Sequence, residues 1–308
     1  MGYALAWAHD LGSDAGVAMG SGRVARLRLG TAGLLGALLM LVGCQSTQKW
    51  PPVPAGTGPA APIIVLRSSI LQPVLAEHGE LAGTFAGRMT YLVAPSGQTQ
   101  ALAGPLAGTV KNTYIYKSYA AFAGDVAAGR LPASVHAVLY DIEKWPATPL
   151  DEQQHPQSYM RRFSALARAH GLLPILAPAR DLVLVPGGSC PKRGSENLSE
   201  AYIRCGLAGA DQGAAALVVQ SQAEEFDVTA FRHFVATVAR QARAGNPRIA
   251  VLAQLATAPL GQPASVSQLV SAARSVHRLV DGFSLTARNV DTETTAGLLW
   301  AFSRLGKG

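Results

Sequence analysis

The sequence predicts an α/β protein whose core is a (β/α)8 barrel, a closed ring of eight parallel strands surrounded by helices. Eight short apolar runs follow one another, with starts about 23 to 42 residues apart, which suits βα units of about 30 residues. Most intervals between the runs hold a helix-like stretch. An open doubly wound sheet is the alternative, but no Gly-rich phosphate-binding loop follows any run, which favours the barrel.

The expected strands are short, rich in aliphatic residues and bounded by turn-forming residues. They cover residues 63–67, 89–93, 113–117, 136–141, 173–178, 215–220, 249–254 and 282–286.

The clearest helices show apolar residues at helical spacing and end near glycine or proline. They cover residues 158–169, 228–244, 264–280 and 292–305. The second βα unit differs, because residues 95–110 contain three Gly and two Pro. We therefore expect its helix to be degenerate or missing.

The first 44 residues have the pattern of a secretory signal peptide. Three arginines within positions 23–28 precede an apolar run over 29–42 that is short for a membrane span, and this order marks an export signal. The run ends in the sequence LVGC, whose last residue is Cys44. This ending resembles the lipobox of bacterial lipoproteins. The resemblance implies cleavage before Cys44 and lipid modification of that cysteine.

The predicted organisation is a signal peptide over 1–44, a tether over 45–62 and one barrel domain over 63–308. The tether is rich in Pro, Gly and Ala, a composition typical of a semi-extended spacer. Two acyl chains on Cys44 would hold the protein stably. We expect a cell-envelope protein, lipid-anchored to the outer face of a bacterial membrane. The true start is either Met1 or Met19, because a conventional signal peptide begins at the latter.

Two cysteines remain once Cys44 is assigned to lipidation. Cys190 and Cys205 lie 15 residues apart, and in an oxidising compartment such a pair usually forms a disulfide. Closing a loop of this length contributes roughly 3 kcal/mol in the chain-entropy model. We therefore predict a disulfide between them.

Composition and charge exclude several functional classes. The chain is 49% hydrophobic and therefore able to bury a core, and its formal net charge of +7 comes from scattered bases. Without a basic run or interleaved aromatic residues, a nucleic-acid partner is not expected. No His cluster with metal-ligand spacing is present, so we expect no metal and no cofactor.

Polar and aromatic residues follow the strands at the rim where a parallel barrel displays its chemistry. Side chains alternate along a strand, so Asp141 and Glu143 face the same space. Gln220, Gln222 and Glu224 share a parity and should face it too. The predicted catalytic residues are Glu143, Asp141 and Glu224, and the predicted substrate-binding residues are Tyr116, Lys117, Trp145, Arg180, Gln220, Gln222 and Gln254.

Such a rim suits a carbohydrate, whose hydroxyl groups bind amides and carboxylates and whose faces stack on rings. The sequence Asp141-Ile142-Glu143 resembles the end of the catalytic strand of chitinase-type (β/α)8 glycoside hydrolases. In that family the Glu is the general acid and the Asp assists a substrate N-acetyl group. The resemblance implies that Glu143 is the acid, that Asp141 is its partner and that the ligand is a glycan.

Two interpretations stay open. The first is a glycoside-hydrolase-like lipoprotein with Glu143 as acid, and the second is a non-catalytic barrel that binds a glycan or another ligand. An acid at a strand end also often pairs with an arginine, and Arg161 or Arg180 could serve Asp141 in that way. Hydrolysis would place a second carboxylate, Asp141 or Glu224, roughly 5 to 9.5 Å from Glu143 across an open cleft.

Overall fold

The computed structural model describes residues 61–98, 106, 108–209, 213–287 and 291–305. The expected signal peptide, the lipidation site Cys44 and most of the expected tether lie outside the described residues.

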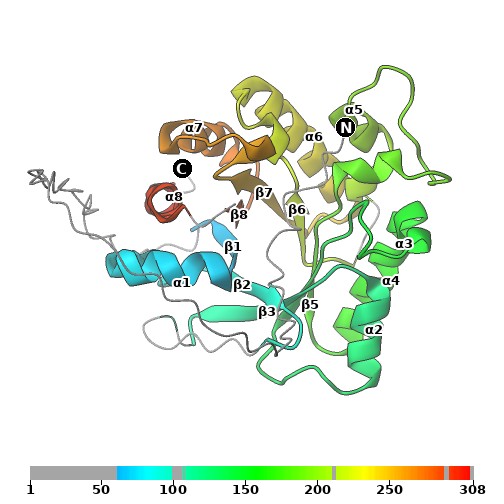
Figure 1. Cartoon of the computed structure of the whole chain (residues 1–308), viewed down its shortest axis with the longest axis horizontal. Coiled ribbons are helices and arrows are strands. Elements are labelled where there is room, and N and C mark those ends of the chain that lie inside the picture. Colours follow the sequence, from blue (N-terminus) through cyan, green and yellow to red (C-terminus); the bar gives the residue numbers. More distant parts are fainter. Residues whose placement is uncertain (1–60, 99–105, 107, 210–212, 288–290, 306–308) are drawn as a thin grey trace, which may run out of the picture.

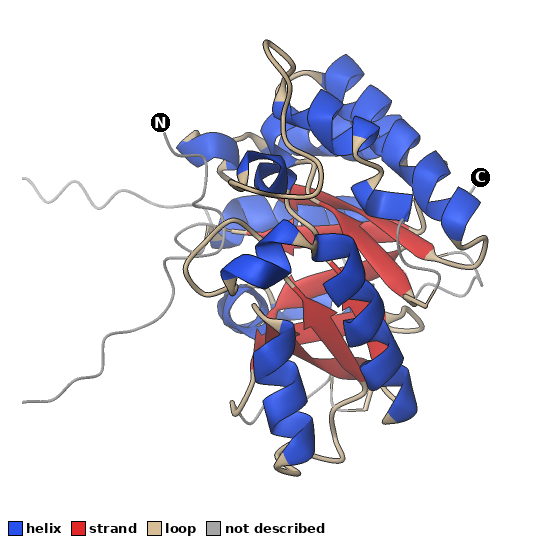
Figure 2. Ribbon diagram, turned by 90° about the vertical axis from the view of Figure 1, so that its right-hand side faces the viewer, coloured by secondary structure: helices blue, strands red, loops and turns tan. Residues whose placement is uncertain are grey.

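The predicted barrel is confirmed. Eight parallel strands pair in chain order, and β1 pairs with both β2 and β8, which closes the ring. Figures 1 and 2 show the strands at the centre with helices packed around them. The strands are β1 (Ile63–Arg67), β2 (Thr90–Pro95), β3 (Val110–Tyr116), β4 (Ala137–Tyr140), β5 (Leu173–Leu176), β6 (Ala216–Val219), β7 (Ala250–Ala256) and β8 (Gly282–Thr286).

Helices follow most strands. The α-helices of the described residues are α1 (Ser68–Glu77), α2 (Tyr119–Ala127), α3 (Leu150–Gln154), α4 (Pro156–Ala169), α5 (Leu198–Arg204), α6 (Val228–Gly245), α7 (Val266–Val276) and α8 (Thr292–Arg304). Short 3-10 helices are η1 (Gly79–Phe85), η2 (Arg180–Leu184), η3 (Leu207–Gly209), η4 (Gln222–Glu224) and η5 (Pro259–Gly261). Between β2 and β3 the described residues, 96–98, 106 and 108–109, contain no helix. Most of this connection lies outside the described residues, so a degenerate or missing helix here stays a prediction.

Strand alternation divides the core into two parts. In β4, Ala137 and Leu139 belong to the apolar cluster inside the barrel, whereas Val138 and Tyr140 belong to the larger cluster between the barrel and its helices. Both clusters are almost fully buried. A residue that continues the first series past the end of β4 is therefore aimed at the barrel axis, and Asp141 holds that position.

Gly282 allows the barrel to close. A Cβ atom placed on this residue would lie 2.0 Å from the carbonyl oxygen of Ile63 on the neighbouring strand β1. Because real Cβ atoms do not approach an oxygen so closely, only glycine permits β8 and β1 to pair in this register.

No helix within the described ranges is both long enough and apolar enough to cross a membrane.

Candidate functional site

The centre of the site is a pair of buried carboxyl groups that follow β4. Asp141 is 0% exposed and Glu143 is 4% exposed. The two carboxyl groups lie close together, because the side-chain Nε2 of Gln220 contacts an oxygen of each, at 3.3 Å for Asp141 and 3.2 Å for Glu143. This corrects the expectation that Asp141 lies across an open cleft from Glu143, because Asp141 is fully buried and does not line the cavity that Glu143 lines.

Burial raises the pKa of both carboxyl groups of this pair, and neighbouring charges modify it. Burial raises the pKa of Asp141 to about 7, although the cationic side chains of Arg67 and Lys117 oppose the rise. Burial also raises the pKa of Glu143 well above its ordinary value, and the nearby charges of Asp141 and Asp181 raise it further. Both effects favour the protonated form of Glu143.

Gln220 connects the pair to the end of β6, two strands further around the barrel from β4. Its side-chain Nε2 donates to Asp141 Oδ1 at 3.3 Å, to Glu143 Oε1 at 3.2 Å and to the carbonyl oxygen of Ala177 at 3.0 Å. The prediction that this amide faces the two acids is confirmed. Because it holds both carboxyl groups, Gln220 fixes their orientation as well as their separation.

A cavity of about 700 Å³ lies above the pair, in the size range of small-molecule sites. Loops that follow β4, β5, β6, β7 and β8 contribute to its walls. Of the predicted site residues, those that line it are Glu143, Arg180, Gln220, Gln222 and Glu224. The structure thus brings five of the predicted residues together at the carboxyl end of the barrel.

Glu224, one of the predicted catalytic residues, lines the cavity but is held in an ion pair. Its Oε1 lies 2.6 Å from Arg180 Nη1 in an ion pair, and it also accepts a hydrogen bond from Ser199 Oγ at 2.6 Å. Because β6 ends at Val219, residues 222–224 form the 3-10 helix η4 and strand alternation does not extend to them. Glu224 therefore faces Arg180, and this arginine pairs with Glu224 in place of Asp141.

Tyr116 does not line the cavity, which corrects its assignment to substrate binding. Its neighbour Ile115 belongs to the interior cluster, so Tyr116 points outward. Its ring packs 5.1 Å from that of Phe122, centroid to centroid, and its hydroxyl group donates to Asp125 Oδ2 at 2.9 Å, both in α2. This side chain joins the barrel to a helix.

Lys117 and Trp145 also lie outside the cavity lining, which corrects their assignment to substrate binding. The ammonium group of Lys117 lies 4.2 Å from the ring centroid of Trp145, and the indole is only 6% exposed. Its N–H donates to Thr148 Oγ1 at 2.6 Å. Lys117 acts instead as a nearby charge that opposes the rise in the pKa of Asp141.

Gln254 is fully buried in β7 and does not reach the cavity lining. Neither atom of its amide group has a hydrogen-bond partner among the described residues. Leaving such a group unpaired costs about 1 to 3 kcal/mol. The amide therefore does not occupy the position expected for contact with a substrate.

Two carboxyl groups, one in the cavity wall and one buried beside it, were absent from the predicted residues. Asp181 lines the cavity, accepts the backbone N–H of Lys144 at 3.1 Å and has a pKa raised by burial. Glu225 is 2% exposed, accepts the backbone N–H of Ala256 at 2.8 Å and has a pKa raised well above its ordinary value by burial. The position of Asp181 just after the fifth strand was a usable signal, whereas nothing in the sequence distinguished Glu225.

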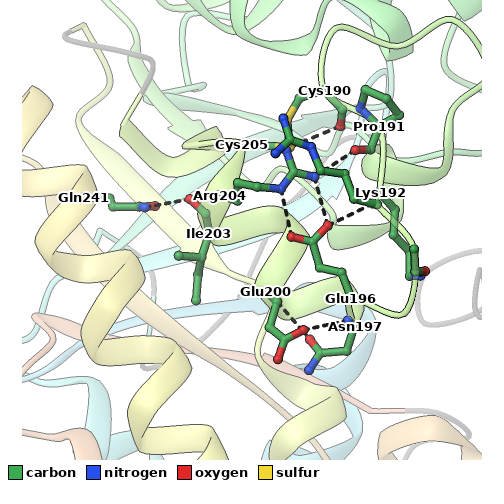
Figure 3. Close-up of polar contacts among 12 residues, drawn as sticks. Cys190, Pro191, Lys192, Glu196, Asn197, Glu200, Ile203, Arg204, Cys205 and Gln241 are labelled. Atoms are coloured by element: carbon green, nitrogen blue, oxygen red, sulfur yellow. Dashed lines mark hydrogen bonds and ion pairs between the residues drawn. A yellow bond between two sulfur atoms is a disulfide. The ribbon is translucent and has the colours of Figure 1, made fainter.

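The predicted disulfide is confirmed, with an S–S distance of 2.02 Å between Cys190 and Cys205. Figure 3 shows Arg204 beside it, where its guanidinium group binds Glu196 at 2.8 Å and the carbonyl oxygen of Pro191 at 2.8 Å. The segment closed by the disulfide contributes residues to the cavity wall, namely Lys192, Asn197, Leu198 and Ser199. The disulfide thus restrains one wall of the cavity.

No group of three or more His, Cys, Asp or Glu side chains within the described ranges is arranged to hold a metal ion.

No family model and no curated protein matches this sequence. Among solved structures, the chain is similar to a chitinase from Chromobacterium violaceum, with 12% identity and a TM-score of 0.45 over 78% of this chain and 99% of that one. It is also similar to the PgaB (BpsB) glycoside hydrolase domain from Bordetella bronchiseptica, with 12% identity and a TM-score of 0.43 over 78% and 99% of the two chains.

The triosephosphate isomerase of Bartonella henselae shows a comparable similarity, with 12% identity and a TM-score of 0.40 over 80% of this chain and 98% of that one. These likenesses concern the barrel alone, and no functional conclusion for this chain follows from them.

Proposed function

We propose that this chain is a glycoside-hydrolase-like barrel that acts on a glycan, with Glu143 as the general acid. The observation that supports the proposal is the buried carboxyl pair at the cavity. A general acid needs a proton that it holds near neutral pH and can deliver to the leaving oxygen. Glu143 meets both conditions, because its raised pKa keeps it protonated and its side chain lines the cavity.

In this proposal Asp141 is the partner of the acid. Its carboxyl group lies close to that of Glu143, and Arg67 and Lys117 favour its charged form. When Glu143 transfers its proton to the glycosidic oxygen, the bond between that oxygen and the anomeric carbon breaks and positive charge develops on the sugar ring. The charge of Asp141 would stabilise that ring. The reaction is completed when the oxygen of a water molecule bonds to the anomeric carbon and a proton of that water returns to Glu143.

A second candidate is a non-catalytic barrel that binds a glycan or another polar ligand. The observation that favours it is the state of Glu224, whose charge is neutralised by Arg180 at 2.6 Å. A carboxylate held in this way is poorly suited to act as a nucleophile or a base.

Lipid attachment at Cys44 and a location on the outer face of a bacterial membrane complete the proposal. The lipobox-like ending at Cys44 supports it. Labelling cells with a fatty acid analogue should mark the wild-type protein and leave a Cys44→Ser variant unlabelled. Equal labelling of both would overturn the assignment of this cysteine.

The catalytic role is tested by screening a panel of polysaccharides and oligosaccharides for release of reducing sugar. Glu143→Gln keeps the side-chain shape and removes the transferable proton, so we expect a loss of at least about a hundredfold in kcat. Glu200→Gln is the matched control, since Glu200 is exposed, does not line the cavity and caps α5 in a box that glutamine also forms. Hydrolysis that Glu143→Gln leaves unchanged would overturn the assignment of the acid.

A further inference from the structure

The cavity beside Glu143 has walls that are largely aliphatic. Leu184 at the end of η2, Leu198 at the start of α5 and Leu260 in η5 all line it, together with alanines from several loops. Among the described residues that line the cavity there is no aromatic ring. A sugar face normally stacks on a ring, so these walls suit a different chemical group from the sugar itself.

Two of these leucines are exposed although they face a cavity. Leu184 is 42% exposed and Leu260 is 54% exposed. They come from the loops after β5 and β7, and both line the same space. Apolar surface that stays in water is unfavourable for the empty protein and becomes favourable when a ligand covers it.

Leu260 also has an unfavourable backbone conformation. Its φ is 53° and its ψ is 22°, in the left-handed region, and it is the only non-glycine residue with a positive φ within the described ranges. Glycine would adopt this conformation without strain. A leucine that is both strained and exposed is unfavourable for the empty protein, which points to a role of its side chain in binding.

The polar and apolar parts belong to one continuous cavity. Its lining is partly polar, with Glu143 and Gln220 and also Arg180, Lys192 and Glu224, and partly aliphatic, with the three leucines. A ligand that fits both parts carries a polar head and a hydrocarbon portion. Methyl groups of leucine and alanine, without rings, match a saturated chain.

We propose that the ligand of this cavity is a sugar that carries an alkyl or acyl chain, with the sugar at Glu143 and the chain along Leu184, Leu198 and Leu260. Only the placement of the sugar rests on the proposed function. The preference for a chain follows from the cavity walls and holds whether or not Glu143 performs hydrolysis.

Calorimetric titration with n-octyl and methyl β-D-glucopyranoside, below the concentration at which the octyl compound forms micelles, tests the proposal. The full chain carries Cys44→Ser, so that the protein can be handled without detergent. We expect the octyl compound to bind about tenfold more tightly or better, which corresponds to the burial of about two methylene groups. Equal affinity for the two compounds would overturn the proposal.

Three variants locate the effect. Leu260→Gly removes the side chain and relieves the backbone strain, so it should fold at least as stably as the parent while losing most of the octyl preference. Leu184→Ala should lose part of the preference. Leu150→Ala is the control, because Leu150 is 57% exposed and lies outside the cavity lining. A preference unchanged in both cavity variants, or lost equally in the control, would show that the chain binds elsewhere.

The outcomes separate the two proposals of function and ligand. Hydrolysis that depends on Glu143 without any octyl preference would overturn the chain proposal alone. A clear octyl preference in a protein that hydrolyses no glycan would overturn the catalytic proposal alone. Glu143→Gln should keep the octyl preference in either case, because the acid does not touch the chain.

Discussion

The buried carboxyl pair predicts that the protein loses stability as the pH rises from about 4 to about 7. Burial raises the pKa of Asp141 from 3.8 to about 7, so within this range the folded chain holds a proton that the unfolded chain has released. Unfolding then releases a proton, and stability falls as pH rises. The stabilisation is fully present below about pH 4 and is lost as the pH passes about 7. For Asp141 alone it corresponds to roughly 4 kcal/mol.

Asp141→Asn tests this reasoning, because asparagine keeps the shape of the side chain and does not titrate. We expect the fall in the free energy of unfolding between about pH 4.5 and about pH 7.5, measured by urea denaturation, to be a few kcal/mol smaller than in the wild type. Asp227→Asn is the control, since Asp227 is exposed and caps α6, a role that asparagine fills equally well. Parallel profiles for the wild type and Asp141→Asn would refute the idea that burial governs this carboxyl group.

Two further predictions concern the scaffold that carries the site. Replacing Cys190 and Cys205 together by serine should reduce the free energy of unfolding by about 3 kcal/mol, the value for a loop of this length, and a reducing agent should then change the wild type but not the variant. Gly282→Ala should cost about 3 kcal/mol or more, because its Cβ would collide with the backbone of Ile63, whereas Gly79→Ala, with open space around it, should stay within about 0.5 kcal/mol. Thermal unfolding of both glycine variants checks this, and an equal cost at the two positions would count against the close approach.

Strand alternation accounts for what the sequence predicted well and for where the prediction ended. Asp141 and Gln220 directly follow the last residues of β4 and β6, where the alternation still points them toward the barrel axis, and the structure joins them at 3.3 Å. Past Val219 the backbone turns into η4. Glu224 was predicted by extending the alternation over this turn, and it meets Arg180 instead. Periodicity predicts a side chain's direction only while the strand continues.

The aromatic residues show a second limit. Tyr116 and Trp145 stand next to the expected rim in the sequence, and both are buried in the structure, at 2% and 6% exposure. Tyr116 contacts α2, and the ring of Trp145 lies against Lys117. Their sequence positions predicted the correct end of the barrel but not whether the cavity would reach them, since that depends on which neighbouring side chains cover them.

The sequence by itself determined the barrel, the position of the acidic pair at the end of its fourth strand and the disulfide. These features follow from local rules, namely apolar periodicity, alternation and the pairing of two cysteines in a chain that is expected to be exported. Only the tertiary structure decided that burial raises the pKa of both Asp141 and Glu143, that Arg180 forms an ion pair with Glu224 and that leucines line the cavity. The burial of a side chain, the charges near it and the walls of a cavity depend on segments that lie far apart in the chain. Only the folded structure therefore shows how they combine.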